Sequence, residues 1–165
     1  MTTVVGVVGN PRAESRTHAL CRAIVAELAA VAGGAQTDEV DLAALDPRAL
    51  DRDDPALQLV LAADVLVVAS PTYHATYSWL LKGFLDHLGT GALAGTPAVP
   101  ILLGGAPDHR LAIDVHFIPL LLQLGAATPV RGLFVLESEV DGFAAWAAGW
   151  ARDQGPALLR AARPA

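Results

Sequence analysis

Short apolar runs alternate along this chain with longer segments in which apolar residues recur at helical spacing. Five strands are predicted, over Thr3–Val8, Gln36–Leu42, Val65–Ala69, Ala98–Leu103 and Val130–Leu136. Five helices are predicted, over Arg16–Val31, Pro55 to about Ala62, Ser78–Leu88, Asp108–Leu124 and Gly142–Arg163. We expect the last helix to be disturbed at Gly155-Pro156, because both residue types are poor helix formers.

Local signals mark several of the predicted helix ends. Ser15 offers an N-cap for the first helix, and Gly33-Gly34 follows its last turn. Asp54-Pro55 combines a capping residue with proline at the first helical position of the next helix. These signals support an alternation of strand and helix along the whole chain.

That alternation predicts the architecture. Strands separated by helices pair in parallel through right-handed crossovers, and the helices cover both faces of the sheet. We expect an α/β three-layer sandwich with a five-stranded parallel sheet in the order 2-1-3-4-5, forming one domain over residues 1–165. In that order the crossovers of the first and third strands leave in opposite directions, which opens a ligand crevice at their carboxyl ends.

Hydrophobic residues make up 53% of the chain, so a membrane-spanning segment has to be considered. The longest uncharged stretch, His87–Pro107, is interrupted by glycines and prolines, and the others fall short of the roughly 18 apolar residues a span needs. The N-terminus lacks the basic region of a signal peptide. We therefore expect a soluble protein with no membrane association, whose excess apolar residues form the core and a subunit interface.

Charge and cysteine content further limit the functions that this protein could have. The net charge of −6 and the lack of a Lys/Arg cluster argue against a nucleic-acid partner. A single cysteine, Cys21, fits a reducing, cytoplasmic location and inert packing. His109 and His116 share a helix face, but no Cys, Asp or Glu cluster completes a metal site. No G-x-S-x-G motif supports a serine hydrolase.

The loop after the first strand has the composition of a phosphate site. The hydroxyls of Ser15 and Thr17, the guanidinium groups of Arg12 and Arg16, and the free N–H groups at the helix start all favour a dianion. The alternative is that Ser15 only caps the helix and both arginines are solvated. The loop contains neither GxGxxG nor GxxxxGK[ST].

Two further loops end at the same predicted edge. After the third strand, Tyr73 and Tyr77 follow Pro71 and suit a flat heteroaromatic ring, although Tyr77 could instead belong to a packed helix face. After the fourth strand, Gly104-Gly105 would let the backbone approach a ligand, or would simply form a tight turn.

The three loops together resemble a known family. The patterns G-[SN]-P-R-x-x-S-R-T, P-x-Y-x-A-x-Y-S-x-x-L-K-x-F-L-D and G-G-x-x-x-H-x-L-A-x-D, over about Val4 to Ala126, are similar to those of the NAD(P)H-dependent FMN reductases, in particular the reductase components of two-component alkanesulfonate monooxygenase systems. The resemblance implies a flavodoxin-like fold that binds FMN.

The resemblance also implies roles for individual residues. Those expected to hold the FMN phosphate are Asn10, Arg12, Ser15, Arg16 and Thr17. Those expected to line the ribityl chain and the isoalloxazine ring are Pro71, Thr72, Tyr73 and His74, with Tyr77 and Ser78 of the same motif also counted as cofactor-binding. Gly104 and Gly105 are expected to approach the polar edge of the ring.

The implied activity is hydride transfer from NADPH or NADH to FMN, with reduced FMN supplied to a partner monooxygenase. The flavin carries this chemistry, so no side chain is assigned as a catalytic acid or base. Three alternatives stay open: an NAD(P)H-dependent quinone, azo or metal-ion reductase, a flavodoxin-type electron carrier, and a flavin-free interaction domain.

Two predicted helices are apolar nearly all round, in the sequences LAIDVHFIPLLLQLG and WLLKGFLDHL. A helix that covers one face of a sheet needs only one apolar stripe, so this pattern predicts a second partner. Trp146 and Trp150 could dock the last helix or join the same contact. We expect a homodimer or a homotetramer.

Overall fold

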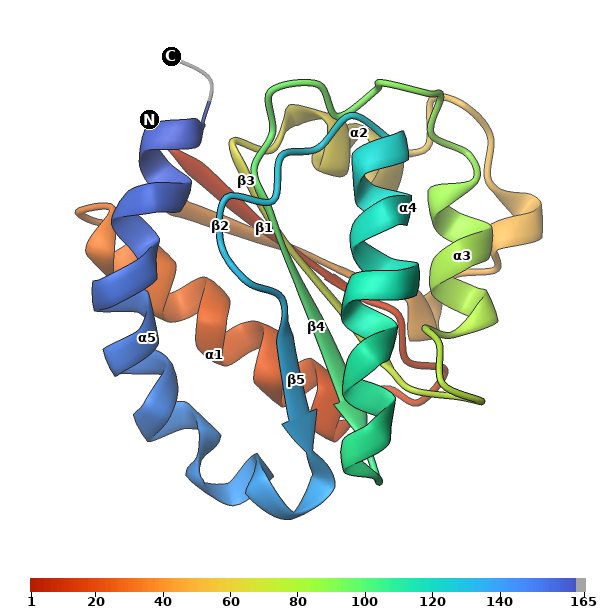
Figure 1. The fold of residues 1–165 in the computed structure, drawn as a ribbon. Coiled ribbons are helices and arrows are strands. Elements are labelled where there is room, and N and C mark those ends of the chain that lie inside the picture. Colours follow the sequence, from red (N-terminus) through yellow and green to blue (C-terminus); the bar gives the residue numbers. More distant parts are fainter. Residues whose placement is uncertain (163–165) are drawn as a thin grey trace.

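The computed structural model describes residues 1–162, and its strands form one parallel sheet in the order β2-β1-β3-β4-β5 (Figure 1). The strands are β1 (Thr3–Val8), β2 (Gln36–Asp41), β3 (Val65–Pro71), β4 (Ala98–Gly104) and β5 (Leu133–Leu136). The α-helices are α1 (Arg16–Val31), α2 (Pro55–Ala62), α3 (Trp79–Leu85), α4 (Ile118–Gln123) and α5 (Val140–Ala161). The expected α/β class and strand order are confirmed.

Helices cover both faces of this sheet, as Figure 1 shows with α1 and α5 on one side and α3 and α4 on the other. Alternate residues of β1 enter two separate cores. Val5 and Val7 pack with α2, α3 and α4, whereas Val4 and Val8 pack with α1 and α5. Two-sided burial explains why the central strands read as continuous apolar runs.

The predicted helix over Asp108–Leu124 is wrong as a single α-helix. The segment starts as a 3-10 turn (Pro107–Arg110) and passes through a π-helical turn (Ile113–Phe117) before α4. Pro119 accounts for this, because it has no N–H to bond the carbonyl of Val115 and its ring would clash with that carbonyl in a regular α-helix. In the π turn the N–H of Ile118 bonds the carbonyl of Ile113 instead.

Two strands are shorter than predicted. β2 stops at Asp41, whose carboxylate accepts the N–H of Ala43 (3.0 Å) and starts a 3-10 turn over Leu42–Ala44. β5 begins at Leu133 rather than Val130. Its register places Pro100 of β4 just beyond the first pair, and Pro100 has no N–H to extend the ladder.

The predicted disturbance at Gly155-Pro156 is also wrong, because α5 continues through both residues. The helix begins at Val140, two residues before the predicted start at Gly142. Gly155 serves packing: a Cβ there would lie 3.2 Å from Val31 Cγ1 and 3.3 Å from Leu28 Cδ2 of α1. Glycine therefore lets α5 approach α1 closely. The predicted last residue of this helix, Arg163, lies outside the described residues.

Cys21 of α1 lies fully buried against the sheet, and burial raises the pKa of its thiol well above the ordinary value. The thiol therefore stays protonated and packs as a small apolar group, as expected. Within residues 1–162, no helix is long and apolar enough to cross a membrane. Two further 3-10 turns lie at Pro47–Ala49 and Glu137–Glu139.

Gly9 sits where the chain leaves β1, directly beneath α3. Its N–H bonds the carbonyl of Ala69 at the end of β3 (2.7 Å), and a Cβ there would lie 2.6 Å from Leu81 Cβ. That distance is shorter than packed carbon atoms tolerate, so the closeness of α3 to β1 requires glycine here.

Replacing Gly9 by Ala should lower the free energy of unfolding by about 1–3 kcal/mol, because α3 must shift to admit the methyl group. Chemical denaturation measures this effect. The matched control is Gly149→Ala in α5, where the new Cβ would meet only Arg152, at 3.9 Å. That variant should gain about 0.5–1 kcal/mol from helix propensity. Equal stability changes in the two variants would contradict the packing argument.

Candidate functional site

The loops after β1, β3 and β4 leave the sheet at its carboxyl edge, where the first two run side by side (Figure 1). In the first loop, Asn10 is 7% exposed and organises its neighbours. Its Nδ2 donates to Thr17 Oγ1 (3.0 Å) and its Oδ1 accepts the N–H of Arg12 (2.9 Å). These bonds close the loop from Asn10 to Thr17 into a fixed turn, with the Arg12 side chain exposed.

The first turn of α1 follows directly. Ser15 caps it by accepting the N–H of His18 (3.2 Å), so the predicted capping role is correct. The N–H groups of Arg16 and Thr17 have no intrahelical acceptor, because they belong to the first helical turn. The guanidinium of Arg16 pairs with Glu137 after β5 (3.1 Å), and both side chains are exposed. Free N–H groups and arginines at a helix start favour an anion.

His18 anchors this helix start to β2, a role that the sequence did not reveal. Its Nε2 lies 2.6 Å from Glu39 Oε1, and its Nδ1 lies 3.6 Å from Asp41 Oδ2. Arg22 bonds the other oxygen of Glu39 (3.1 Å). Only the pairing of β1 with β2 brings these residues to α1, so chain spacing carries no signal for them.

The second loop contains a two-residue hairpin. Tyr73 and Thr76 exchange backbone hydrogen bonds (2.9 and 3.1 Å), and the two residues between them, His74 and Ala75, have φ values of 48° and 59°. Left-handed backbone at two non-glycine residues is strained and persists only where the surroundings fix it. The hairpin leaves Tyr73 44% exposed at the carboxyl edge of the sheet.

Thr72 and Gly104 lie together at the ends of β3 and β4. The N–H of Thr72 bonds the carbonyl of Leu103 (2.8 Å), while its buried Oγ1 has no partner within residues 1–162. A Cβ at Gly104 would lie 3.3 Å from that oxygen and 2.7 Å from the Phe134 ring. At Gly105 a Cβ would meet no atom within 4 Å. An unpartnered hydroxyl beside bare backbone suits a polar ligand edge.

Ser78 is 1% exposed, and its hydroxyl joins the two loops. It donates to the carbonyl of Gly9 (2.5 Å) and accepts the N–H of Leu81 (3.1 Å), while its own N–H bonds Ser70 Oγ (2.8 Å). The structure therefore gives Ser78 a positioning role.

Tyr77 is half-buried and tilts against Phe117, with ring centroids 5.5 Å apart. This contact supports the alternative that Tyr77 belongs to a packed helix face. Burial raises the pKa of its hydroxyl, so the group stays protonated at neutral pH.

The loops thus offer an anion site at the start of α1, an exposed tyrosine on a strained hairpin, and bare backbone at the end of β4. An elongated ligand with a phosphate at one end and a flat polar ring at the other fits this order of groups. His109, which the sequence analysis weighed only as a metal ligand, has a buried Nδ1 with no partner among the described residues. No cluster of His, Cys, Asp or Glu within residues 1–162 could hold a metal ion.

Comparison with known proteins identifies the class. The fold places the chain among the flavodoxin-like α/β proteins. A solved NADH:FMN oxidoreductase in its apo form is similar, with 32% identity, a TM-score of 0.84, and coverage of 96% of this chain and 90% of that one. The chain belongs to the NADPH-dependent FMN reductase family, whose model matches residues 2–141.

Curated relatives agree with this membership. An NADH-dependent FMN reductase, SfnF, of Pseudomonas putida is 36% identical over 84% of this chain and 79% of its own length. An FMN reductase (NADPH) of Pseudomonas aeruginosa is 35% identical over 85% of this chain and 80% of its own length. The resemblance noted from the motifs is confirmed, and the chain is an oxidoreductase of the NAD(P)H- and FMN-dependent class.

Proposed function

We propose that this chain binds FMN at the carboxyl ends of β1 and β3 and reduces it with NAD(P)H. The observation that carries the proposal is the convergence there of a helix start, an aromatic hairpin and a glycine pair. When bound, FMN supplies the position that accepts hydride, and the protein binds, orients and shields it.

The loop after β1 would bind the phosphate end of FMN. The start of α1 and the guanidinium groups of Arg12 and Arg16 hold the phosphate, and Asn10 and Thr17 keep that loop in shape. The exposed Arg16 side chain would leave Glu137 to bind the phosphate, or would bind Glu137 and the phosphate together.

The other two loops would hold the ring. Thr72 donates its free hydroxyl to the ligand, and Tyr73 covers a ring face beside His74. The backbone N–H groups of Gly104 and Gly105 face the ring edge where negative charge develops. Pro71, Tyr77 and Ser78 fix the loop that carries these groups.

Reduced FMN would pass to a partner monooxygenase, in keeping with the motifs shared with two-component systems. Quinones and azo compounds are alternative acceptors at the same site. The cytoplasmic location and the one-domain organisation over residues 1–165 stay predictions from the sequence.

We also propose that the chain is a homo-oligomer, a dimer or a tetramer, in which the α3–α4 face meets a second copy. Large apolar side chains are exposed there on neighbouring helices, namely Trp79, Leu111, Val115 and Leu122. An exposed apolar patch on two adjacent helices is typical of a subunit interface.

Oxidation of NAD(P)H tests the function directly. The flavin-free protein should oxidise NAD(P)H only when FMN is added, and single replacements of His74, His109 or His116 by Gln should leave measurable turnover. The reason is that hydride transfer to flavin needs no side-chain acid or base. A loss of about a thousandfold from one histidine at saturating FMN would contradict this, since general acid–base groups supply about 10²–10⁴-fold.

The phosphate assignment predicts tighter binding of FMN than of riboflavin. Arg12→Ala should weaken FMN binding by about 1.5–3 kcal/mol, or tenfold to a hundredfold, because a hydrogen bond to a charged group is lost. Riboflavin affinity should stay unchanged. Arg48→Ala is the control, because Arg48 is exposed and pairs with Asp46 outside the crevice. Flavin fluorescence titration measures the dissociation constants of both flavins for each protein, and equal wild-type affinity for FMN and riboflavin would refute the assignment.

The oligomer is tested by mass. Light scattering at micromolar concentration should give at least a dimer for the wild type and a smaller species for Leu122→Glu, which buries a charge in the proposed interface. Leu122 is 52% exposed, so the isolated chain should tolerate the change. Arg152→Glu, on the exposed side of α5, should keep the wild-type mass. A monomeric wild type would overturn the proposal.

A further inference from the structure

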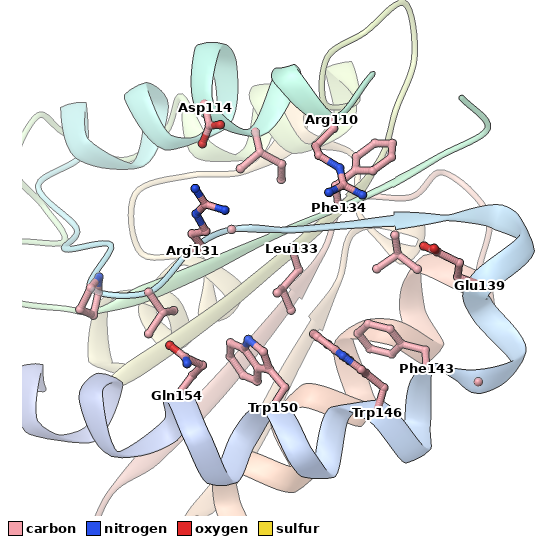
Figure 2. A pocket seen from close by; sticks show the side chains of 16 residues that line it. Arg110, Asp114, Arg131, Leu133, Phe134, Glu139, Phe143, Trp146, Trp150 and Gln154 are labelled. Carbon is pink, nitrogen blue, oxygen red and sulfur yellow. The ribbon is translucent and has the colours of Figure 1, made fainter. Parts of the chain in front are cut away.

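A long groove runs along the outer edge of β5. Its volume is about 1010 Å³. In Figure 2, Arg110 and Asp114 form one wall, Trp146 and Trp150 of α5 form the other, and the β5 segment lies between them. Nothing in the proposed flavin site uses this volume.

The α5 wall is a row of aromatic rings. The Phe143 and Trp146 centroids are 5.2 Å apart, and Trp146 and Trp150 stack at 6.3 Å. Mutual contacts hold the rings in place, yet Trp146 is 48% exposed. A fixed and accessible row of indoles is suited to stacking against a flat heteroaromatic ring.

Two guanidinium groups line the groove on the other side of the β5 segment from the indoles. Arg110 lies over the Phe134 ring, 6.0 Å from its centroid. Arg131 extends from the start of the β5 segment toward the wall that carries Asp114 (Figure 2). Among the described residues Arg131 has no ion pair. Two arginines opposite an aromatic wall suit a ligand that combines a flat ring with phosphate groups.

One end of the groove lies next to Gly104. Phe134 lines the groove, and its ring also fills the space next to Gly104, where a Cβ would lie 2.7 Å away. Gly104 is the residue whose backbone approaches the ring edge in the proposed function. A ligand that reacts at the flavin could therefore extend past Phe134 into the groove.

Pairing of another strand with β5 is the competing use of this edge, and the structure disfavours it. β5 has only four residues. The N–H of Leu136 is already bonded to Glu139 Oε2 (3.0 Å), which blocks one end of the strand. An edge protected by a charged side chain is a poor template for a further strand.

We propose that this groove binds the adenosine diphosphate half of the nicotinamide donor, an assignment that rests on the proposed reductase function. The adenine stacks on Trp146 and Trp150, and Arg110 and Arg131 meet the diphosphate. The nicotinamide then reaches the flavin past Phe134.

The test compares two hydride donors. One is the nicotinamide dinucleotide that the wild type uses, and the other is 1-benzyl-1,4-dihydronicotinamide, which lacks the adenosine diphosphate half. Trp150→Ala and Arg131→Ala should each raise KM for the dinucleotide about tenfold with little change in kcat, in line with loss of one stacking or charged contact. Turnover with the truncated donor should not change. Trp150→Phe should recover part of the loss, and Arg48→Ala should behave as wild type.

A binding measurement tests the groove without relying on enzyme turnover. Titration of the flavin-free protein with ADP-ribose should quench tryptophan fluorescence in the wild type, and Arg131→Ala should weaken this binding about tenfold. The groove is refuted if ADP-ribose gives no quenching, or if the variants lose both donors equally or neither. If ADP-ribose binds but the wild type uses neither donor, the reductase proposal fails and the groove assignment stands.

Discussion

Gly9 is hydrogen-bonded on both sides to β3 and its loop, and the arrangement of the site depends on this contact. Its N–H bonds Ala69 at 2.7 Å, and its carbonyl accepts the Ser78 hydroxyl at 2.5 Å. Because no side chain fits between Gly9 and Leu81, α3 sits directly on the end of β1. The distance between the loop after β1 and the loop after β3 is therefore fixed. The same contacts fix the distance between the start of α1 and the Tyr73 hairpin. A ligand that binds both must match this distance.

Proline shows where the sequence predicts local structure and where it does not. Pro55 at the first helical position marked the start of α2 correctly, because its effect there is local. Pro100 shortened β5 through its neighbour in the sheet, and Pro119 forced a π turn. Pro156 left α5 continuous, because the packing of α5 on α1 outweighs one lost hydrogen bond. The bounds of β1 and α1 were predicted to the residue, since caps and glycines define them within the chain.

The sequence predicted which loops form the candidate site, but not the hydrogen bonds that join these loops. Strand order alone brings the three loops to one edge, so composition was enough to select them. The roles within each loop depend on contacts between distant segments. The polar groups of Asn10 and Ser78 bond protein atoms and hold the loops in place, a role that loop composition does not reveal. The role of His18 was missed because its partner Glu39, in β2, lies 21 residues away in the chain.

The two proposed sites share one wall, and this has a consequence for how the donor and the flavin are brought together. Phe134 lies against the bare backbone of Gly104 and also carries Arg110 over its ring. A larger residue at position 104 would displace Phe134, and the displaced ring would move Arg110 in the groove. The geometry at the end of β4 therefore couples the position of the proposed flavin edge to that of Arg110. Rigid coupling of this kind suits hydride transfer, in which the rate depends on holding two rings at a fixed separation. Gly104 fits this position because a Cβ there would lie 2.7 Å from the Phe134 ring.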